Sequence, residues 1–446
     1  MANSKKIMDK SIPRGRLSGV ATPPCSKSYA QRALAAALLA EGETVLRNLD
    51  FCDDTLSAIR VIETLGAEVE RLDERTVKVR GGLAPKSNLL NVGESGLATR
   101  MFTPIASLCN MPITVQGEGT LLYRPMHMMI EPLRKLGVDV RDGGGRLPVE
   151  VCGPIQGGEI EVDGSVSSQF LTGLLMALPL AEEDTTIAVE NAVSKPYLDM
   201  TMDLASKFGV NIQHNDYEEF FVEGGQKYEA TDLVIEGDWS AAAKLLVAGA
   251  VAGKVTLTNV SMLSKQADVA ICDALVRAGA SVTSEPDSIT VEHRDLVAFE
   301  FDATQCPDLF PALAALAAAA EGESVIYGTH RLEHKESNRA ESINQEYSKL
   351  GIEVRLEGDA MYIKGGEIHS AECDSHHDHR IAMSLAVSAL RSDGEVGIQY
   401  AECVAKSYPD FFAVLESLRV SEYLCGTIVS AQSSKLRFGV HHTRLK

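Results

Sequence analysis

A single structural unit recurs along this chain with a period of about 70 residues. An apolar, helix-like run that ends in glycine and leads into a short strand occurs five times, with almost evenly spaced glycines at Gly66, Gly137, Gly209, Gly279 and Gly351. A β-branched strand after an acidic or glycine-containing turn recurs with the same spacing, centred on Val45, Thr114, Ile187, Val255, Val325 and Val396. Two independent markers with one period predict six copies of one supersecondary unit.

Each copy has the pattern strand, helix, strand, helix, strand, which predicts an α/β fold. In the first copy, helices are expected over residues 29–39 and 53–65. Asp53 and Asp54 are expected to cap the second of these helices, with Gly66 just beyond its end. The helical runs are rich in alanine and leucine, which predicts helices that are buried on most sides.

Six units divide into two domains of three units each. Residues 1–22 are expected to pair back into the second half of the chain and to form one domain with residues 236–420. Residues 23–235 form the other domain, and the chain is expected to cross between the two near 21–24 and 234–238. A cleft between two such domains is a natural site for a ligand and for closure over it.

Unusual polar residues share one phase of the repeat. Eight to ten residues after each strand marker stand Asp53, Arg124, Lys195, Lys265, Lys335 and Lys406. Fourteen to twenty residues before each marker stand Lys27, Arg100, the run 167–169, Trp239, Asp308 and the pair 379–380. These positions are where a helical run begins, and helix N-termini offer free N–H groups and a partial positive charge. The pattern therefore predicts several helix starts that converge on an anion.

Composition narrows the class of protein. The formal net charge of −20 argues against a nucleic acid or an anionic membrane as partner. No apolar run reaches the ~18 residues of a membrane span, and the first residues lack the apolar segment of a signal peptide. The nine cysteines show no C-x-x-C spacing, which is typical of a reducing compartment. A cytoplasmic enzyme is expected, with residues 421–446 as a loosely ordered C-terminal tail because they carry no periodic apolar face.

Several segments at the shared phase resemble known signatures. The run at 163–172, Asp-Gly-Ser-Val-Ser-Ser-Gln-Phe-Leu-Thr, resembles the shikimate 3-phosphate motif of the 5-enolpyruvylshikimate-3-phosphate synthase family. Further matches stand in the family's order at residues 24–28 with Arg32, 194–197, 378–380 and 405–410. The resemblance extends from about residue 17 to about residue 418. It implies a two-domain inside-out α/β barrel of six βαβαββ repeats, with pseudo-threefold symmetry in each domain.

The resemblance also implies a reaction and its substrates. The carboxyvinyl group of phosphoenolpyruvate would pass to the 5-hydroxyl of shikimate 3-phosphate, with release of phosphate. Shikimate 3-phosphate would be bound by Lys27, Ser28, Arg32, Ser167, Ser168, Gln169, Ser194, Tyr197, Asp308 and Lys335. Phosphoenolpyruvate would be bound by Lys27, Gly96, Arg124, Gln169, Arg339, Arg380 and Lys406. Two substrates that each carry a phosphate and a carboxylate require many cations, and guanidinium groups suit them best.

The same resemblance suggests which residues move protons. Asp308 would accept the proton of the 5-hydroxyl, and it could at the same time cap the helix expected near residue 310. Lys335 and Glu336 would carry protons to and from the enolpyruvyl group, while Lys27 would contact both substrates. A carboxylate and an amine between phosphates have proton affinities that depend strongly on their surroundings, which suits this work. No metal ion and no other cofactor is expected, and the chain is expected to be a monomer.

The loop at residues 93–97 departs from the family pattern. It reads Gly-Glu-Ser-Gly-Leu where the family usually has Gly-Asn-Ala-Gly-Thr. Glu94 adds a negative charge beside the expected position of a dianion, and Leu97 replaces a hydroxyl with a bulky apolar group. These two changes make the loop geometry and the sensitivity to glyphosate-like competitors open questions.

Two other functions are compatible with parts of the sequence. A sister enzyme with the same fold and donor transfers the group to a UDP-amino sugar, but the run at 167–169 argues for a shikimate phosphate. A non-catalytic anion-binding homologue is the alternative of a different class, and the retained Lys27, Asp308 and Glu336 argue against it. The histidines within 376–379 are dense enough to suggest a metal site, although Asp378-His379-Arg380 already matches a family signature.

Overall fold

Residues 8–420 are described by the computed structural model, and six of its sheets share one pairing scheme. In each sheet two strands run parallel, and the second of them pairs antiparallel with a third. Five of the sheets add a fourth strand, antiparallel to the third. The predicted α/β class is therefore confirmed, with many small mixed sheets in place of one large one.

Three sheets lie in the first part of the chain. Their strands, in sheet order, are β16 (Leu233–Val234), β4 (Glu43–Arg47), β6 (Thr76–Arg80) and β5 (Glu68–Arg71); β7 (Leu89–Asn91), β8 (Ile113–Gln116), β10 (Val149–Cys152) and β9 (Asp139–Asp142); and β11 (Gly158–Asp163), β12 (Thr185–Glu190), β14 (Glu219–Val222) and β13 (Ile212–Asn215). A two-residue strand, β3 (Ala40–Glu41), pairs in addition with β15 (Tyr228–Glu229).

The other three sheets combine the second part of the chain with its beginning. Their strands, in sheet order, are β2 (Leu17–Ala21), β17 (Gly253–Thr258), β19 (Ser288–Glu292) and β18 (Ser281–Glu285); β20 (Glu300–Asp302), β21 (Glu323–Tyr327), β23 (Ala360–Lys364) and β22 (Glu353–Glu357); and β24 (Glu372–Asp374), β25 (Val396–Gln399) and β1 (Lys10–Ile12). Strands β1 and β2, at the beginning of the chain, thus pair with β25 and β17 in its second half.

Six helices are buried almost all round, as their alanine and leucine content predicts. They are α1 (Lys27–Leu39), α3 (Gly96–Ala106), α5 (Gln169–Ala177), α7 (Trp239–Ala252), α9 (Phe310–Ala318) and α11 (His379–Ala389). Side chains this small allow helices to pack closely, and α7, α9 and α11 contact one another, as do α3 and α5. The polar residues at the N-terminal ends of these helices are thereby held by a rigid interior.

A second set of helices has more polar faces. It consists of α2 (Asp53–Leu65), α4 (Ile130–Lys135), α6 (Lys195–Lys207), α8 (Ile271–Arg277), α10 (Arg339–Lys349) and α12 (Phe411–Ser417). Short 3₁₀ turns complete the chain: η1 (Gly119–Tyr123), η2 (His127–Met129), η3 (Leu178–Leu180), η4 (Ala267–Ala270), η5 (Pro307–Leu309), η6 (Thr329–Arg331) and η7 (Ala401–Lys406). Among the described residues, none of the helices is long and apolar enough to cross a membrane.

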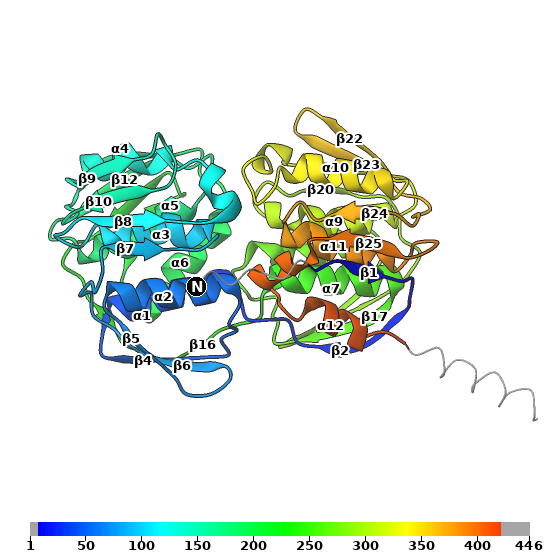
Figure 1. The fold of residues 1–446 in the computed structure, drawn as a ribbon, viewed down its shortest axis with the longest axis horizontal. Coiled ribbons are helices and arrows are strands. Elements are labelled where there is room, and N and C mark those ends of the chain that lie inside the picture. The colour runs from blue at the N-terminus through cyan, green and yellow to red at the C-terminus, as the bar shows by residue number, and fades with distance from the viewer. Residues whose placement is uncertain (1–7, 421–446) are drawn as a thin grey trace, which may run out of the picture.

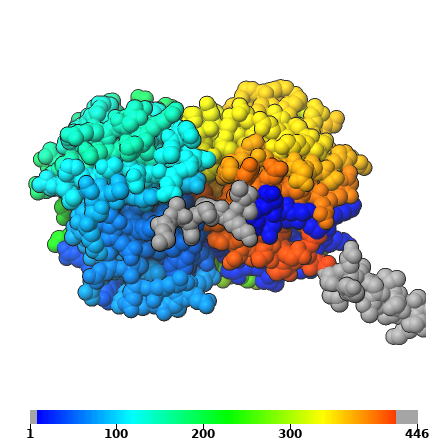
Figure 2. All heavy atoms as spheres, viewed as in Figure 1, coloured from blue at the N-terminus to red at the C-terminus, as the bar shows by residue number. Residues whose placement is uncertain are grey.

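The molecule has two lobes, each with its own hydrophobic core (Figure 1). One core draws on residues from Cys25 to Ile235, and we call the lobe around it the first lobe. The other draws on Ile12 and Leu17 together with residues from Trp239 to Leu418, and this is the second lobe. In the space-filling view the yellow part of the second lobe meets the cyan part of the first (Figure 2).

The two segments that pass between the lobes are bonded to each other. Cys25 and Gly237 form an antiparallel bridge, and the amide of Ser26 donates to the carbonyl of Glu236 at 2.7 Å. The amide of Lys27, at the start of α1, donates to Asp238 Oδ2 at 3.0 Å, just before α7. The buried helices α1 and α7 therefore begin side by side, one in each lobe.

The interpretation of Asp53 and Asp54 as helix caps was wrong. Helix α2 is preceded by Cys52, whose side chain makes no capping hydrogen bond, and the two aspartates form the first turn. Asp54 instead pairs with Lys27 Nζ at 2.9 Å. The expected glycine does end the helix, because Gly66 has a φ of 130° and a Cβ there would lie 2.5 Å from the amide nitrogen of Ala84. The predicted tail, 421–446, lies outside the described residues.

Candidate active site

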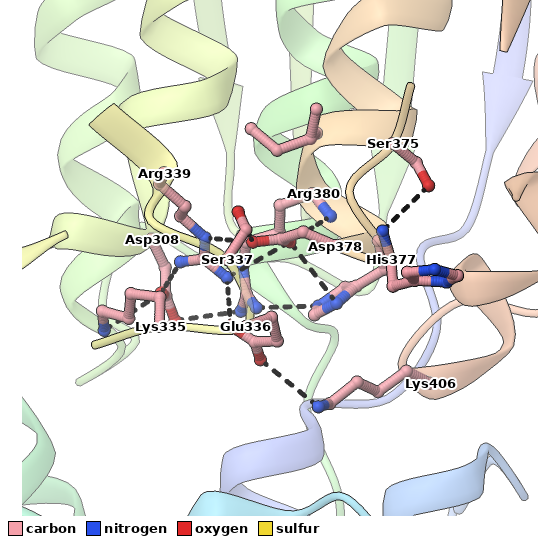
Figure 3. Close-up of polar contacts among 12 residues, drawn as sticks. Asp308, Lys335, Glu336, Ser337, Arg339, Ser375, His377, Asp378, Arg380 and Lys406 are labelled. Carbon is pink, nitrogen blue, oxygen red and sulfur yellow. Dashed lines mark hydrogen bonds and ion pairs between the residues drawn. The ribbon is translucent and has the colours of Figure 1, made fainter. Parts of the chain in front are cut away.

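One buried arginine gathers three carboxylates at the surface of the second lobe that faces the first (Figure 3). Arg339, the first residue of α10, has no exposed side-chain surface. Its Nη1 donates to Asp308 Oδ1 at 2.6 Å, its Nη2 to Glu336 Oε2 at 2.5 Å and its Nε to Asp378 Oδ2 at 2.7 Å. Asp378 also caps α11 by accepting from the amide of Arg380. Two helix starts, one 3₁₀ turn and one loop are thus tied to one guanidinium group.

Of these three carboxylates, Asp308 contacts the largest number of positively charged side chains. Besides Arg339, it contacts Arg380 Nη2 at 2.9 Å and Lys335 Nζ at 3.4 Å. Burial opposes its ionisation, but the charges of Arg380, Lys335 and Arg339 outweigh it and hold the pKa of Asp308 well below its ordinary value. The suggestion that Asp308 caps α9 was wrong, since it lies within η5 and Leu309 holds the cap position.

The pKa values of Lys335 and Glu336 are also shifted from their ordinary values. Burial lowers the pKa of Lys335 to about 8, against the opposing charge of Asp308. Burial works against ionised Glu336, yet Arg339 and Lys406 hold its pKa well below the ordinary value. Lys406 Nζ lies 3.6 Å from Glu336 Oε1. The cluster therefore contains an amine and two carboxylates whose protonation depends on which cations remain beside them.

The first lobe contributes cations with unfilled hydrogen-bonding capacity. Arg100 Nη1 donates to Gln169 Oε1 at 2.7 Å, which ties the start of α5 to α3. Arg124 lies against Gly96, where a Cβ would stand 2.7 Å from Arg124 Nη1. The buried Nε atoms of Arg100 and Arg124 have no hydrogen-bond partner among residues 8–420. Donors of this kind are suited to an anionic ligand.

The residues expected to hold the shikimate ring and its phosphate also lie in the first lobe. Arg32 is buried and donates to the carbonyl of Ser28 at 2.8 Å, while its guanidinium lies 5.9 Å from the ring centroid of Tyr197. Ser167 Oγ accepts from the amide of Gln169 at 3.2 Å, and Ser168 occupies the cap position of α5.

Further hydrogen bonds between the two lobes lie around this cluster. Lys406 Nζ donates to the carbonyl of Glu94 at 3.0 Å. Arg331 Nη2 donates to Ser194 Oγ at 3.2 Å, and the amide of Lys195 donates to Gln305 Oε1 at 3.0 Å. The residues of the two lobes are therefore brought together by direct contact.

Some residues at the shared phase lie away from the cluster. Lys265 is exposed, and Lys195 Nζ lies over the ring of Tyr217 at 5.1 Å from its centroid. Trp239 is fully buried, as expected of a packing residue. Of the six forward positions, Arg124, Lys335 and Lys406 reach the cluster.

The histidines that suggested a metal site face different partners. His376 Nε2 lies 2.8 Å from Glu346 Oε1, the ring of His377 lies 4.4 Å from that of Tyr400, and His379 is buried beside Arg380. Within residues 8–420, the structure contains no group of three or more His, Cys, Asp or Glu side chains arranged to hold a metal ion.

The two departures in the loop at 93–97 both contact other parts of the first lobe. Leu97 is buried in the core of the first lobe. The carboxyl group of Glu94 lies against Gly119, where a Cβ would stand 2.6 Å from Glu94 Cδ. The backbone carbonyl of Glu94, rather than its side chain, meets Lys406.

Several buried polar residues near the cluster were missed by the sequence interpretation. They are Lys244, Asp268 and Arg331. The sequence gives a sign of one of them, since Lys244 is the single charged residue in the apolar run 239–252. The others have ordinary sequence surroundings.

Comparison with known proteins agrees with this geometry. The family model described as EPSP synthase (3-phosphoshikimate 1-carboxyvinyltransferase) matches residues 12–415. The chain belongs to the EPSP synthase family. A 3-phosphoshikimate 1-carboxyvinyltransferase of Clostridium perfringens is 36% identical over 419 residues, covering 93% of this chain and 98% of that protein. A protein of the same name from Methanocorpusculum labreanum is 34% identical and covers 91% of this chain and 97% of its own length.

Solved structures show the same fold. EPSP synthase from Acinetobacter baumannii superposes with a TM-score of 0.81 at 27% identity, covering 93% of this chain and 99% of that chain. The enolpyruvyl transferase NikO from Streptomyces tendae has a TM-score of 0.74 at 18% identity, over 92% of this chain and 96% of its own, which shows a shared fold alone.

Proposed function

We propose that this protein transfers the carboxyvinyl group of phosphoenolpyruvate to the 5-hydroxyl of shikimate 3-phosphate and releases phosphate. The observation that carries the proposal is the arrangement of Asp308 and Glu336 on one buried guanidinium, that of Arg339, opposite the cations of the first lobe. Relatives that align over 97–98% of their own length carry the name of this activity. An arrangement of many cations around two carboxylates is suited to two polyanionic substrates and a proton transfer between them.

The binding roles follow the two lobes. Shikimate 3-phosphate is placed with its phosphate at Ser167, Ser168 and Ser194 and its ring on Tyr197. Phosphoenolpyruvate would lie between the lobes, and its phosphate and carboxylate would share the cations of Arg124, Arg339, Arg380 and Lys406, with Gly96 leaving room for its close approach. Lys27 and Gln169 contact both substrates in this arrangement. Ser28 and Arg32 bind shikimate 3-phosphate.

Substrate charges would alter the proton affinity of the catalytic carboxylate. In the free site, the surrounding cations keep Asp308 a weak base. Once the phosphate and carboxylate of phosphoenolpyruvate share Arg339 and Arg380, less positive charge acts on Asp308, so its pKa rises and it accepts the hydroxyl proton more readily. Binding of the donor thus prepares the base for the acceptor.

The reaction adds and then removes one proton. A proton from Lys335 or Glu336 goes to the methylene carbon of phosphoenolpyruvate, the 5-hydroxyl oxygen attacks the adjacent carbon, and Asp308 takes the hydroxyl proton. Phosphate then leaves as Lys335 or Glu336 takes one proton back from the new methyl group, which restores the double bond. The cations stabilise the tetrahedral intermediate and the leaving phosphate.

The domain division and closure of the molecule belong to the same proposal. We take residues 1–22 with 236–420 and residues 23–235 as two pseudo-threefold domains of an inside-out barrel, which close on the substrates. The shared pairing scheme of the six sheets supports this division. A monomeric state and a cytoplasmic location stay predictions from the sequence.

The test is phosphate release from phosphoenolpyruvate, with shikimate 3-phosphate or a UDP-amino sugar as acceptor. Release with shikimate 3-phosphate alone is expected. Asp308→Ala serves as the inactive comparison, with both substrates still bound and turnover lower by about 10²–10⁴-fold. Release with the sugar alone would keep the fold and overturn the acceptor, whereas no release in a folded protein that still binds phosphate would favour a non-catalytic anion-binding protein.

A further inference from the structure

Helix α7 is buried along its whole length, yet it carries a lysine. Lys244 has no exposed surface, and the remaining residues of Trp239–Ala252 carry no charge. Burying an ammonium group costs several kcal/mol unless hydrogen bonds and counter-charges compensate it. A buried lysine at this position therefore indicates a role that an apolar side chain could not fill.

The ammonium group of Lys244 lies directly behind the candidate active site. Its Nζ donates to the backbone carbonyl of Asp308 at 3.3 Å and to the carbonyl of Ser240 at 2.8 Å, and it lies 3.4 Å from Ser240 Oγ. The same Ser240 hydroxyl accepts from Arg380 Nε at 3.0 Å. Arg380 Nη2 in turn holds Asp308 Oδ2 at 2.9 Å. These four residues form a closed ring of contacts from three elements, α7, η5 and α11.

Charged groups from four neighbouring elements face Lys244. They are Asp268 in η4, Asp308 in η5, Arg339 in α10 and Arg380 in α11. Burial lowers the pKa of Lys244, and burial raises the pKa of Asp268. Asp268 is 1% exposed, and within residues 8–420 neither of its carboxylate oxygens has a hydrogen-bond partner. Of the two carboxylates that face Lys244, Asp308 is bonded to Arg339 and Asp268 is not. Asp268 is therefore the natural counter-charge to Lys244.

We propose that Lys244 is a positioning residue for the carboxyvinyl transfer. It fixes the backbone of Asp308 through the hydrogen bond to its carbonyl group, and it fixes the guanidinium of Arg380 through Ser240. The proposal rests on the proposed function, because Asp308 and Arg380 are the groups that meet the substrates. Lys244 itself contacts neither substrate. A displacement of about 1 Å at a reacting group is enough to lower a rate about a hundredfold, so a rigid support behind Asp308 has a direct effect on turnover.

The main test is Lys244→Met, which keeps the length of the side chain and removes its charge. We expect kcat to fall by about 10- to 100-fold and the KM for phosphoenolpyruvate to rise, since Arg380 loses its support. The KM for shikimate 3-phosphate should change less, because its phosphate is bound in the first lobe. The melting temperature should stay equal or rise, since replacing a buried charge by an apolar group is often neutral or stabilising when the remaining acid, Asp268, can take up a proton.

A second variant tests the same ring without touching the buried charge. Ser240→Ala removes the hydroxyl that joins Lys244 to Arg380, and it should raise the KM for phosphoenolpyruvate with a smaller effect on kcat. Ser384→Ala is the matched control, because Ser384 is also buried, lies in the same helix as Arg380 and bonds the carbonyl of Ile381 and the Tyr347 side chain rather than Arg380 or Lys244. Its kinetic constants should match those of the unaltered protein.

The outcomes separate this proposal from the proposed function. A folded Lys244→Met protein with unaltered kcat and KM, or with losses that only follow a lower melting temperature, would overturn the positioning role. If Lys244→Met does not fold, Ser240→Ala decides, and an unaltered KM for phosphoenolpyruvate would then reject the proposal. If the unaltered protein releases no phosphate, the proposed function fails, and calorimetric binding of phosphoenolpyruvate still tests the support of Arg380; no difference between the unaltered protein and Lys244→Met rejects it.

Discussion

Among single residues, the contact between Gly96 and Arg124 would govern how closely phosphoenolpyruvate approaches α3 in the proposed site. A Cβ at Gly96 would stand 2.7 Å from Arg124 Nη1, so the guanidinium would have to move. We expect Gly96→Ala to raise the KM for phosphoenolpyruvate by about 10- to 100-fold, the equivalent of one charge-assisted hydrogen bond. The KM for shikimate 3-phosphate should stay within about twofold.

Steady-state kinetics with each substrate varied in turn checks this expectation. Gly366→Ala is the control, because a Cβ there meets nothing within 4 Å. Equal losses for both substrates in Gly96→Ala would mean that the loop before α3 does not bind the donor.

Lys335 is the residue whose titration should appear in the pH profile. Burial lowers its pKa to about 8, so the proton-donating ammonium form is present below that pH and is lost as the pH rises through it. We therefore expect kcat/KM, which reports the free enzyme, to fall above pH 8. In Lys335→Arg the guanidinium stays protonated, so activity should be lower overall but without this alkaline limb. An alkaline limb unchanged in Lys335→Arg would assign it to another group.

Among the elements, α1 and α2 are joined at their starts by the pair between Lys27 and Asp54. The two side chains are 13% and 5% exposed and 2.9 Å apart. Asp54→Asn would leave the ammonium without its carboxylate, which should lower the free energy of unfolding by roughly 1–3 kcal/mol and lower kcat/KM for both substrates. Chemical denaturation and kinetics measure the two effects.

A surface pair supplies the comparison for Asp54→Asn. Asp203 and Lys207 in α6 lie 2.8 Å apart but are 41% and 45% exposed, so Asp203→Asn should change stability by less than about 0.5 kcal/mol. If both variants behave alike, the pair at the helix starts contributes no more than an exposed ion pair does.

For the molecule as a whole, the hydrogen bond from the amide of Lys195 to Gln305 Oε1 favours the arrangement in which the lobes meet. A neutral hydrogen bond contributes about 1 kcal/mol, so Gln305→Ala should shift the equilibrium between open and closed forms by about fivefold. In the proposed closure, the KM for both substrates should rise by up to that factor, while kcat at saturation should stay unchanged because bound substrates would hold the lobes closed. Gln226→Ala is the matched control, since Gln226 bonds Asn211 within the first lobe. A change in kcat with unaltered KM would contradict this role.

Local sequence patterns were sufficient to predict the α/β class, the repeated unit and the family. Glycines that end helices are constrained by local backbone geometry, so their period is visible without any tertiary information, and Gly66 ends α2 as predicted. The buried character of α7 and α9 followed from their alanine and leucine content for the same local reason. The phase of the repeat also placed Asp308, Lys335 and Lys406 at the ends of neighbouring elements, and in the structure they lie in one cluster.

Which of these residues meet, and what supports them, depends on tertiary packing. Lys195 and Lys265 share the phase of Lys335 and Lys406, but they lie elsewhere. Lys195 begins α6 and lies over the ring of Tyr217, whereas Lys265 is exposed in the loop before η4. The local pattern predicts that Asp54 caps α2, whereas in the structure Asp54 pairs with Lys27. Lys244 is distant from Asp308 along the chain, and their contact exists only because α7 packs against η5. Local patterns specify elements, whereas charge pairing between buried groups depends on which elements the hydrophobic core brings together.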